Sequence, residues 1–164
     1  MRFYKFLEND IVDCDNGICV SLWYYYCPHM CRGCHNKELW SKDCKEETPR
    51  EEVLAELISL INKNGILRNL SILGGEPLAD GNLEDTKYII EKVKEVFPDI
   101  KIYLWTGYTI EELEKMDTKY ILKNIDTLIE GRFILEKRDI TLKLRGSSNQ
   151  RIFKNINGKL VRYE

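Results

Sequence analysis

The sequence predicts an α/β fold with a mainly parallel sheet. Three observations indicate this class: segments rich in β-formers alternate with segments of helical apolar period, helix-start and helix-stop residues lie between them, and unusual motifs follow the expected strands. A helix that links two parallel strands is the usual form of such an alternation. We expect a single domain over residues 1–164, with a short C-terminal tail from about residue 132.

Segments rich in β-branched and aromatic residues predict the strands. The expected strands are residues 19–26, 69–73, 100–105 and 125–129. In the tail, the turn Asn157-Gly158 has apolar residues on both sides, which predicts a hairpin.

Three helices are expected between these strands. The first begins with Thr48 as its cap and Pro49 in its first turn, and it ends at Asn64-Gly65. The second spans about residues 83–97, and Thr109-Ile110-Glu111-Glu112 opens a short third helix. Each helix therefore falls where a crossover between parallel strands is needed.

Composition and charge exclude several classes of protein. The chain has 25 basic and 27 acidic residues and a formal net charge of −2, which argues against general nucleic-acid binding. No apolar run reaches the roughly 18 residues of a membrane span, and the N-terminal MRFYKFLEND lacks the apolar core of a signal peptide. We therefore expect a cytoplasmic protein with no membrane partner. In that reducing compartment, its six cysteines indicate metal or redox chemistry rather than disulfides.

Three cysteines, Cys27, Cys31 and Cys34, stand at the spacing C-x3-C-x2-C. Thiolates are soft ligands that suit zinc, copper(I) and iron–sulfur clusters. One interpretation is a structural zinc site, which needs a fourth ligand. The candidates for that ligand are Cys44, His29 and His35. The other interpretation is a 4Fe-4S cluster on three protein thiolates, with one iron left open for a small molecule.

A second motif, Gly74-Gly75-Glu76-Pro77, follows the second expected strand. Its glycines permit positive φ angles and close approach of a ligand to the backbone. A tight turn, with Glu76 as a carboxylate near a helix N-terminus, is the alternative. The cysteines, this motif and the segment TGY at 106–108 each follow a strand. Because ligands bind at the carboxyl ends of parallel strands, we expect one site on one rim of the sheet.

The cysteine spacing and the GGE motif together resemble the radical S-adenosylmethionine (SAM) superfamily. Over nearly its whole length the chain is similar to the anaerobic ribonucleotide-reductase activating proteins, a family of short glycyl-radical activating enzymes. The matching segments are DCDNG at 13–17, CPHMCRGCHN at 27–36, Trp40, GGEPL at 74–78, LWTGY at 104–108, Glu130-Gly131-Arg132 and RGSSNQR at 145–151. One departure is Asn16-Gly17-Ile18-Cys19, a shortened loop in which Cys19 replaces a basic residue.

The resemblance implies an incomplete (partial) radical-SAM (β/α) barrel with mainly parallel strands. A full eight-fold barrel typically needs about 250 residues, so the 164-residue chain suits a shorter version. The implied ligands of a 4Fe-4S cluster with an open iron are Cys27, Cys31 and Cys34. The residues implied to lie against SAM are Gly33, Cys34, His35, Gly74, Gly75, Glu76, Glu130 and Arg132.

The resemblance also implies an activity. SAM would be cleaved reductively to methionine and a 5′-deoxyadenosyl radical, which abstracts a hydrogen from a glycine Cα. The implied partners are the large chain (the glycyl-radical subunit) of an anaerobic ribonucleotide reductase and an external one-electron reductant such as flavodoxin or ferredoxin. Two alternatives remain: another small radical-SAM enzyme, similar to a deazaguanine synthase, and a non-catalytic zinc-stabilised binding module. The remaining cysteines, which are Cys14, Cys19 and Cys44, are expected to be free thiols with no catalytic role.

Overall fold

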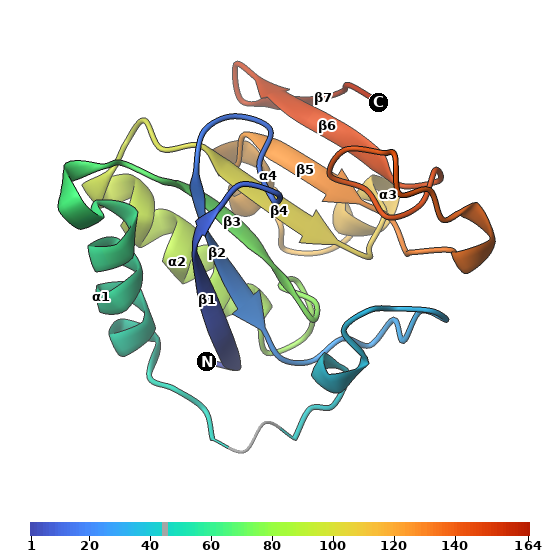
Figure 1. Ribbon diagram of the computed structural model, residues 1–164, viewed down its shortest axis with the longest axis horizontal. Helices are drawn as coiled ribbons and strands as arrows, with labels where there is room; N and C mark the ends of the chain where they lie inside the picture. The colour runs from blue at the N-terminus through green and yellow to red at the C-terminus, as the bar shows by residue number, and fades with distance from the viewer. Residues whose placement is uncertain (44–45) are drawn as a thin grey trace.

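A computed structural model describes residues 1–43 and 46–164 (Figure 1). The alternative zinc ligand Cys44 lies outside these residues. Within the described residues, seven strands form one sheet in which the spatial order equals the chain order. The strands are β1 (Phe3–Asp10), β2 (Cys19–Tyr24), β3 (Asn69–Gly74), β4 (Ile102–Thr106), β5 (Thr127–Glu130), β6 (Arg151–Ile156) and β7 (Lys159–Arg162).

The centre of the sheet is parallel and its two sides are antiparallel. Strands β2, β3, β4 and β5 pair in parallel. On one side β1 pairs antiparallel with β2, and on the other β6 and β7 continue from β5 as an antiparallel hairpin. The predicted α/β class, the four predicted strands and the hairpin at Asn157-Gly158 are confirmed. Strand β1 was not predicted.

The helices follow the strands as crossovers. They are α1 (Arg50–Ile61), α2 (Leu83–Val96), α3 (Ile110–Leu113) and α4 (Lys119–Asn124), with 3-10 turns at Lys37–Leu39, Lys63–Gly65 and Leu135–Lys137. The predicted cap at Thr48 is wrong. Helix α1 has no side-chain cap, because Pro49 rather than Thr48 occupies the N-cap position, and the Thr48 backbone exchanges hydrogen bonds with Met1. At α3 the capping box of Thr109 and Glu112 is present in full.

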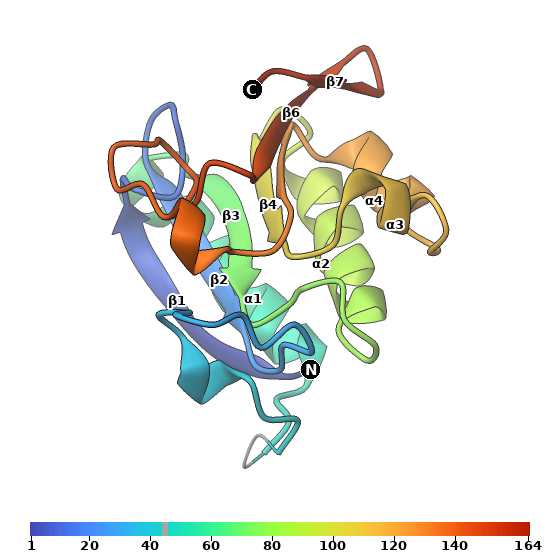
Figure 2. The same cartoon turned by 90° about the vertical axis from the view of Figure 1, so that its right-hand side faces the viewer.

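The two faces of the sheet are covered differently. One face packs against the helices, and every second residue along a strand points toward it. Leu22, Ile72 and Leu104, on three neighbouring strands, are buried on this face. In Figure 2 the helices α2, α3 and α4 lie to the right of the strands, and the blue and orange loops lie to the left. None of the described helices is long and apolar enough to cross a membrane. The larger of the two hydrophobic clusters therefore lies between the sheet and its helices.

The opposite face carries a smaller cluster of Cys14, Cys19 and Tyr103 beside polar groups, and the loop between β1 and β2 covers it in part. Ser71 donates to the carbonyl of Asp13, and Tyr103 donates to the Asp15 carboxylate at 2.6 Å. The thiols of Cys14 and Cys19 are buried and unpaired beneath this loop, as predicted for free thiols. This arrangement leaves the carboxyl ends of the parallel strands as the accessible rim.

The β1–β2 loop gives a prediction for the pH dependence of stability. Burial and the neighbouring Asp10 raise the pKa of Asp13 to about 7. In the unfolded chain this carboxyl ionises near its usual pKa of about 3.9, so the free energy of unfolding falls as pH rises from about 4 through about 7. Asp13→Asn cannot ionise, and it should raise the thermal midpoint at pH 8 with little effect at pH 4.

Differential scanning calorimetry between pH 4 and pH 8 measures this difference. Asp99→Asn removes an exposed carboxylate and serves as the matched control, which should show no such trend. A stabilisation by Asp13→Asn that is equal at both ends of the range would contradict the assignment.

Candidate functional site

A cavity of about 200 Å³ lies at the carboxyl ends of β2, β3 and β4. It brings together segments that are far apart in the sequence: the cysteine loop (residues 27–36), the GGE motif, the end of β4 and the segment after β5. Its lining is Cys27, His29, Cys31, Asn36, Leu73, Gly74, Gly75, Glu76, Trp105, Thr106, Gly107, Gly131, Phe133 and Gln150. The single rim expected from the sequence is therefore present.

The cysteine loop leaves β2 through a series of tight turns. Tyr26 and Met30 have positive φ angles of 76° and 45°, and Gly33 has a φ of 80°. A hydrogen bond from the Cys34 amide to the Cys31 carbonyl, at 3.0 Å, closes the last turn. The glycine is required at this point, because its φ is positive and a Cβ there would lie 2.8 Å from Leu135 Cδ1.

The three thiols of this loop are half-buried, and burial affects their acidity. Burial raises the pKa of Cys27 to about 11 and also raises the pKa of Cys31, where a backbone hydrogen bond from Phe133 acts in the opposite direction. Cys27 and Cys31 line the cavity and Cys34 does not. Thiols need to be deprotonated to bind a metal, so binding at this loop would release protons.

Three thiols on one ten-residue loop fit the donor chemistry of an iron–sulfur cluster. Among the residues that the structure describes, no group of three or more His, Cys, Asp or Glu side chains is arranged around one metal-ion position. Two histidines were considered as zinc ligands. The His29 ring bonds to Glu76, and His35 is exposed.

The Glu76 carboxylate is the most tightly held group at the rim. Glu76 is 1% exposed. One carboxylate oxygen accepts hydrogen bonds from the Thr106 hydroxyl at 2.7 Å and from the Leu78 amide at 3.0 Å. The other accepts from the Gly107 amide at 2.7 Å and contacts His29 Nε2 at 2.9 Å. The carboxylate therefore joins the loops that follow β2, β3 and β4.

His29 is a structural partner of this carboxylate. Its side chain is 4% exposed, and its ring makes an edge contact with Tyr108 at a centroid distance of 4.5 Å. It also covers Gly107, where a Cβ would lie 2.3 Å from His29 Cδ2. Because a carboxylate only accepts hydrogen bonds, the Nε2 atom of His29 is the donor.

The glycines of the GGE motif are required by the packing of two chain segments. A Cβ at Gly74 would lie 2.5 Å from the Tyr24 nitrogen, and one at Gly75 would lie 2.3 Å from the Tyr26 carbonyl oxygen. Gly75 and Glu76 donate their amides to the carbonyls of Tyr24 and Tyr26 at 2.8 and 2.6 Å. This close approach brings Glu76 under the cysteine loop. The implied contacts of the GGE residues with SAM stay predictions.

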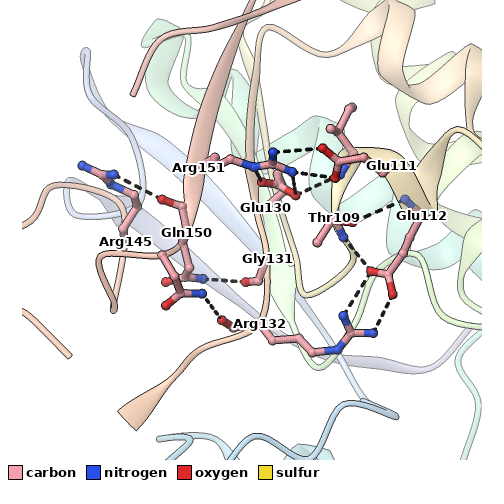
Figure 3. A network of polar contacts seen from close by, with 11 residues as sticks. Thr109, Glu111, Glu112, Glu130, Gly131, Arg132, Arg145, Gln150 and Arg151 are labelled. Atoms are coloured by element: carbon pink, nitrogen blue, oxygen red, sulfur yellow. Dashed lines mark hydrogen bonds and ion pairs between the residues drawn. The ribbon is translucent and has the colours of Figure 1, made fainter. Parts of the chain in front are cut away.

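Glu130 and Arg132, drawn in Figure 3, do not line the cavity of about 200 Å³ beside the cysteine loop. Gly131, which stands between them in the chain, does line it. Glu130 alternates with Ile129, so it lies on the same face of β5 as the core residue Leu128. Its buried carboxylate accepts from the Ile110 amide at 2.9 Å and forms an ion pair with Arg151. Both side chains border a neighbouring cavity of about 490 Å³, and their implied contact with SAM stays a prediction.

The charged groups around Glu130 fix the start of α3. Arg151 also pairs with Glu111 and lowers the pKa of that carboxyl to about 2. Arg132 donates both guanidinium nitrogens to the Glu112 carboxylate, at 3.1 and 3.0 Å (Figure 3). The acidic first turn of α3 is thereby tied to β6 and to the segment after β5.

Comparison with known proteins places this site in a family. A family model described as a 4Fe-4S single cluster domain matches residues 15–153. The chain is 38% identical over 157 residues to the anaerobic ribonucleoside-triphosphate reductase-activating protein of Pasteurella multocida. The aligned region covers 94% of this chain and 98% of the relative. The chain belongs to this family. Relatives of the same name come from Vibrio cholerae (35% identity, 92% of this chain and 96% of the relative) and Enterobacteria phage T4 (36% identity, 87% of each).

Membership confirms the family that the motifs indicated, and the chain carries a 4Fe-4S cluster domain. That domain disfavours the interpretation as a zinc-stabilised binding module. The sequence alone indicated His29 only as a candidate zinc ligand and assigned no role to Thr106, Phe133 or Gln150, and all four line the cavity. The available signal was position, since Thr106 lies in LWTGY, Gln150 lies in RGSSNQR, and Phe133 directly follows Glu130-Gly131-Arg132.

The bonds of Glu76 give a prediction for stability. In Glu76→Gln the amide nitrogen replaces an oxygen that accepts hydrogen bonds, so a buried donor faces other donors. We expect the free energy of unfolding to fall by about 1–3 kcal/mol, measured by urea unfolding of the metal-free protein. Glu91→Gln, at an exposed position of α2, is the control and should leave stability nearly unchanged. An equal effect of the two substitutions would show that the carboxylate is not a structural tie.

Proposed function

We propose that this chain activates an anaerobic ribonucleoside-triphosphate reductase by generating a glycyl radical on the reductase's large chain. The names of the relatives given above state the activation of such a reductase. The observation that carries the proposal is the cysteine loop: three thiols on one loop of a 4Fe-4S domain, two of them bordering the cavity at the rim.

The chain's own residues would bind and orient the cofactors. Cys27, Cys31 and Cys34 would hold a 4Fe-4S cluster and leave one iron open, since the loop offers three thiols. When bound, the cluster and SAM supply the one-electron chemistry that removes a hydrogen atom from a glycine Cα, with the electron coming from an external reductant such as flavodoxin or ferredoxin. Such a reductant suits a reducing compartment, as predicted for the cytoplasm.

SAM would bind beside the open iron along the rim. The backbone of Gly74 and Gly75 lines the cavity, and we assign it the amino group of SAM. Glu76 contributes by holding the rim, because protein donors occupy both of its carboxylate oxygens. Gly33 and His35 flank Cys34 and would approach SAM from the cysteine loop.

The contacts of Glu130 and Arg132 support a different role from the one implied by resemblance. Glu130 accepts a hydrogen bond from the Ile110 amide, and Arg132 forms an ion pair with Glu112. Both residues therefore contact the first turn of α3. They therefore shape the rim next to β4 and β5.

The fold suits this function as an incomplete radical-SAM barrel forming one domain. Four parallel strands with crossover helices supply the rim. Loops, rather than helices, cover the second face among the residues described, where Trp105 donates to the carbonyl of Leu144 at 2.8 Å. The target glycine lies within another folded chain, so a short barrel with one accessible side provides the access that this substrate needs.

The proposal is tested by anaerobic reconstitution with iron and sulfide. We expect about four irons per chain, an electron paramagnetic resonance signal that changes when SAM is added, and a glycyl radical signal after addition of the reductase large chain. Cys27→Ala, Cys31→Ala and Cys34→Ala should each abolish all three results. Cys14→Ala, at a buried cysteine away from the rim, is the control, and Cys44→Ala decides whether a fourth thiol takes part.

Two results would overturn the proposal. One is tightly bound zinc that iron does not replace, with no spectral response to SAM. The other is a SAM-responsive cluster that leaves no radical on the reductase, which would move a small-molecule radical-SAM activity to first place.

A further inference from the structure

The segment Arg145–Arg151 leads into β6, and its side chains bind the backbone that follows β5. Gln150 Nε2 donates to the Gly131 carbonyl at 3.0 Å, and Asn149 Nδ2 donates to the Arg132 carbonyl at 2.8 Å (Figure 3). The Ser147 hydroxyl accepts from the Ile134 amide at 3.2 Å. Three side chains of one short segment thus hold the backbone of residues 131–134.

The amide of Gln150 is itself fixed in orientation. Its oxygen accepts hydrogen bonds from the Gly146 and Ser147 amides, at 2.9 and 3.1 Å. Because the oxygen is used there, the amide nitrogen faces the Gly131 carbonyl. The side-chain amide of Gln150 thus links the backbone at Gly146 and Ser147 to the backbone at Gly131, and both stretches lie outside the strands.

The backbone held in this way touches the cysteine loop. Phe133 lines the same cavity as Cys31. Leu135 packs against Gly33, as shown by the 2.8 Å from its Cδ1 to a Cβ placed on the glycine. Arg32 and Glu136 form an ion pair. In Figure 1 the orange segment after β5 accordingly lies beside the end of the blue loop.

The segment from 131 to 134 depends on these contacts for its position. It lies between the end of β5 and the 3-10 turn at Leu135–Lys137 and belongs to neither. Gly131 turns the chain there with a φ of 98°, a conformation that suits glycine. Carbonyls outside regular structure need other donors, and Asn149 and Gln150 supply them at two consecutive residues.

We propose that Asn149 and Gln150 are positioning residues for the cysteine loop. Their amides hold the backbone at Gly131 and Arg132, and that backbone fixes Cys31 at the cavity. The consequence for cluster binding rests on the proposed function, whereas the positional claim concerns the metal-free chain alone.

The test measures the accessibility of individual thiols in metal-free, reduced protein. Asn149→Asp and Gln150→Glu are nearly isosteric, but each removes an N–H donor and places an oxygen against a backbone carbonyl. Iodoacetamide alkylation is followed at each cysteine by mass spectrometry. In each variant we expect the rate at Cys31 to rise about fivefold, the factor that corresponds to one typical hydrogen bond. The rates at the buried Cys14 and Cys19 should stay unchanged.

Asn155→Asp is the matched control. Asn155 likewise donates its side-chain amide to backbone carbonyls, those of Lys123 at 3.0 Å and Ile125 at 2.9 Å, but it lies at the far end of β6. This variant should leave the Cys31 rate at the wild-type value.

Two outcomes would overturn the inference. In the first, Cys31 reacts at the wild-type rate in both rim variants. In the second, the rates at Cys14, Cys19 and Cys31 rise together, which indicates global loss of stability. Because the assay contains no iron, failure of the proposed function would show in the iron and radical measurements and not here.

Discussion

The rim of this protein depends on one buried charge. A carboxylate removed from water is costly unless hydrogen bonds replace its hydration. Glu76 receives those bonds from Thr106, Gly107, Leu78 and His29. The donors come from three different loops, so satisfying the charge requires the loops after β2, β3 and β4 to meet. The cavity beside the cysteines is a consequence of that meeting.

The same constraint explains the two glycines before Glu76. The carboxylate reaches its donors only if β3 ends close against the backbone of Tyr24 and Tyr26, and no side chain fits in that space. The glycine pair thus has a structural cause that is independent of any ligand. A ligand bound at this rim would meet backbone groups that are already fixed, which lowers the cost of ordering them.

The far side of the rim relies on ion pairs. Helix α3 has four residues and cannot be stable by itself. Its capping box satisfies two of its amides, while Arg151 and Arg132 bind Glu111 and Glu112 in its first turn. Negative charge at a helix N-terminus is favourable, and Glu130 adds to it by accepting from Ile110. These polar contacts act together with the burial of Leu113 in the core to hold α3 in place.

Sequence patterns predicted the parts of the fold that carry local signals. The parallel strands, α1, α2 and the capping box at Thr109 all have such signals within a few residues. Strand β1 was missed because register shifts between Phe3 and Lys5 and between Leu7 and Asp10 break its two-residue alternation. Helix α4 was missed because it has only six residues.

The candidate site was predicted in outline, and its contacts were not. The motifs after successive strands located the rim, because strand ends of a parallel sheet meet at one edge. The bond between His29 and Glu76 joins residues 47 apart, and the pair of Glu130 and Arg151 depends on the register between β5 and β6. Neither contact is marked by a local sequence pattern. The sequence could therefore not show that Glu130 faces α3 or that His29 is buried.

Hydrogen exchange at the Gly107 amide tests the central role of the Glu76 carboxylate most directly. It can be followed by nuclear magnetic resonance in the metal-free protein. The account predicts slow exchange in the wild type and exchange at least about tenfold faster in Glu76→Gln, the factor for a loss of about 1.4 kcal/mol. Wild-type exchange at Gly107 as fast as at an exposed loop amide would contradict it.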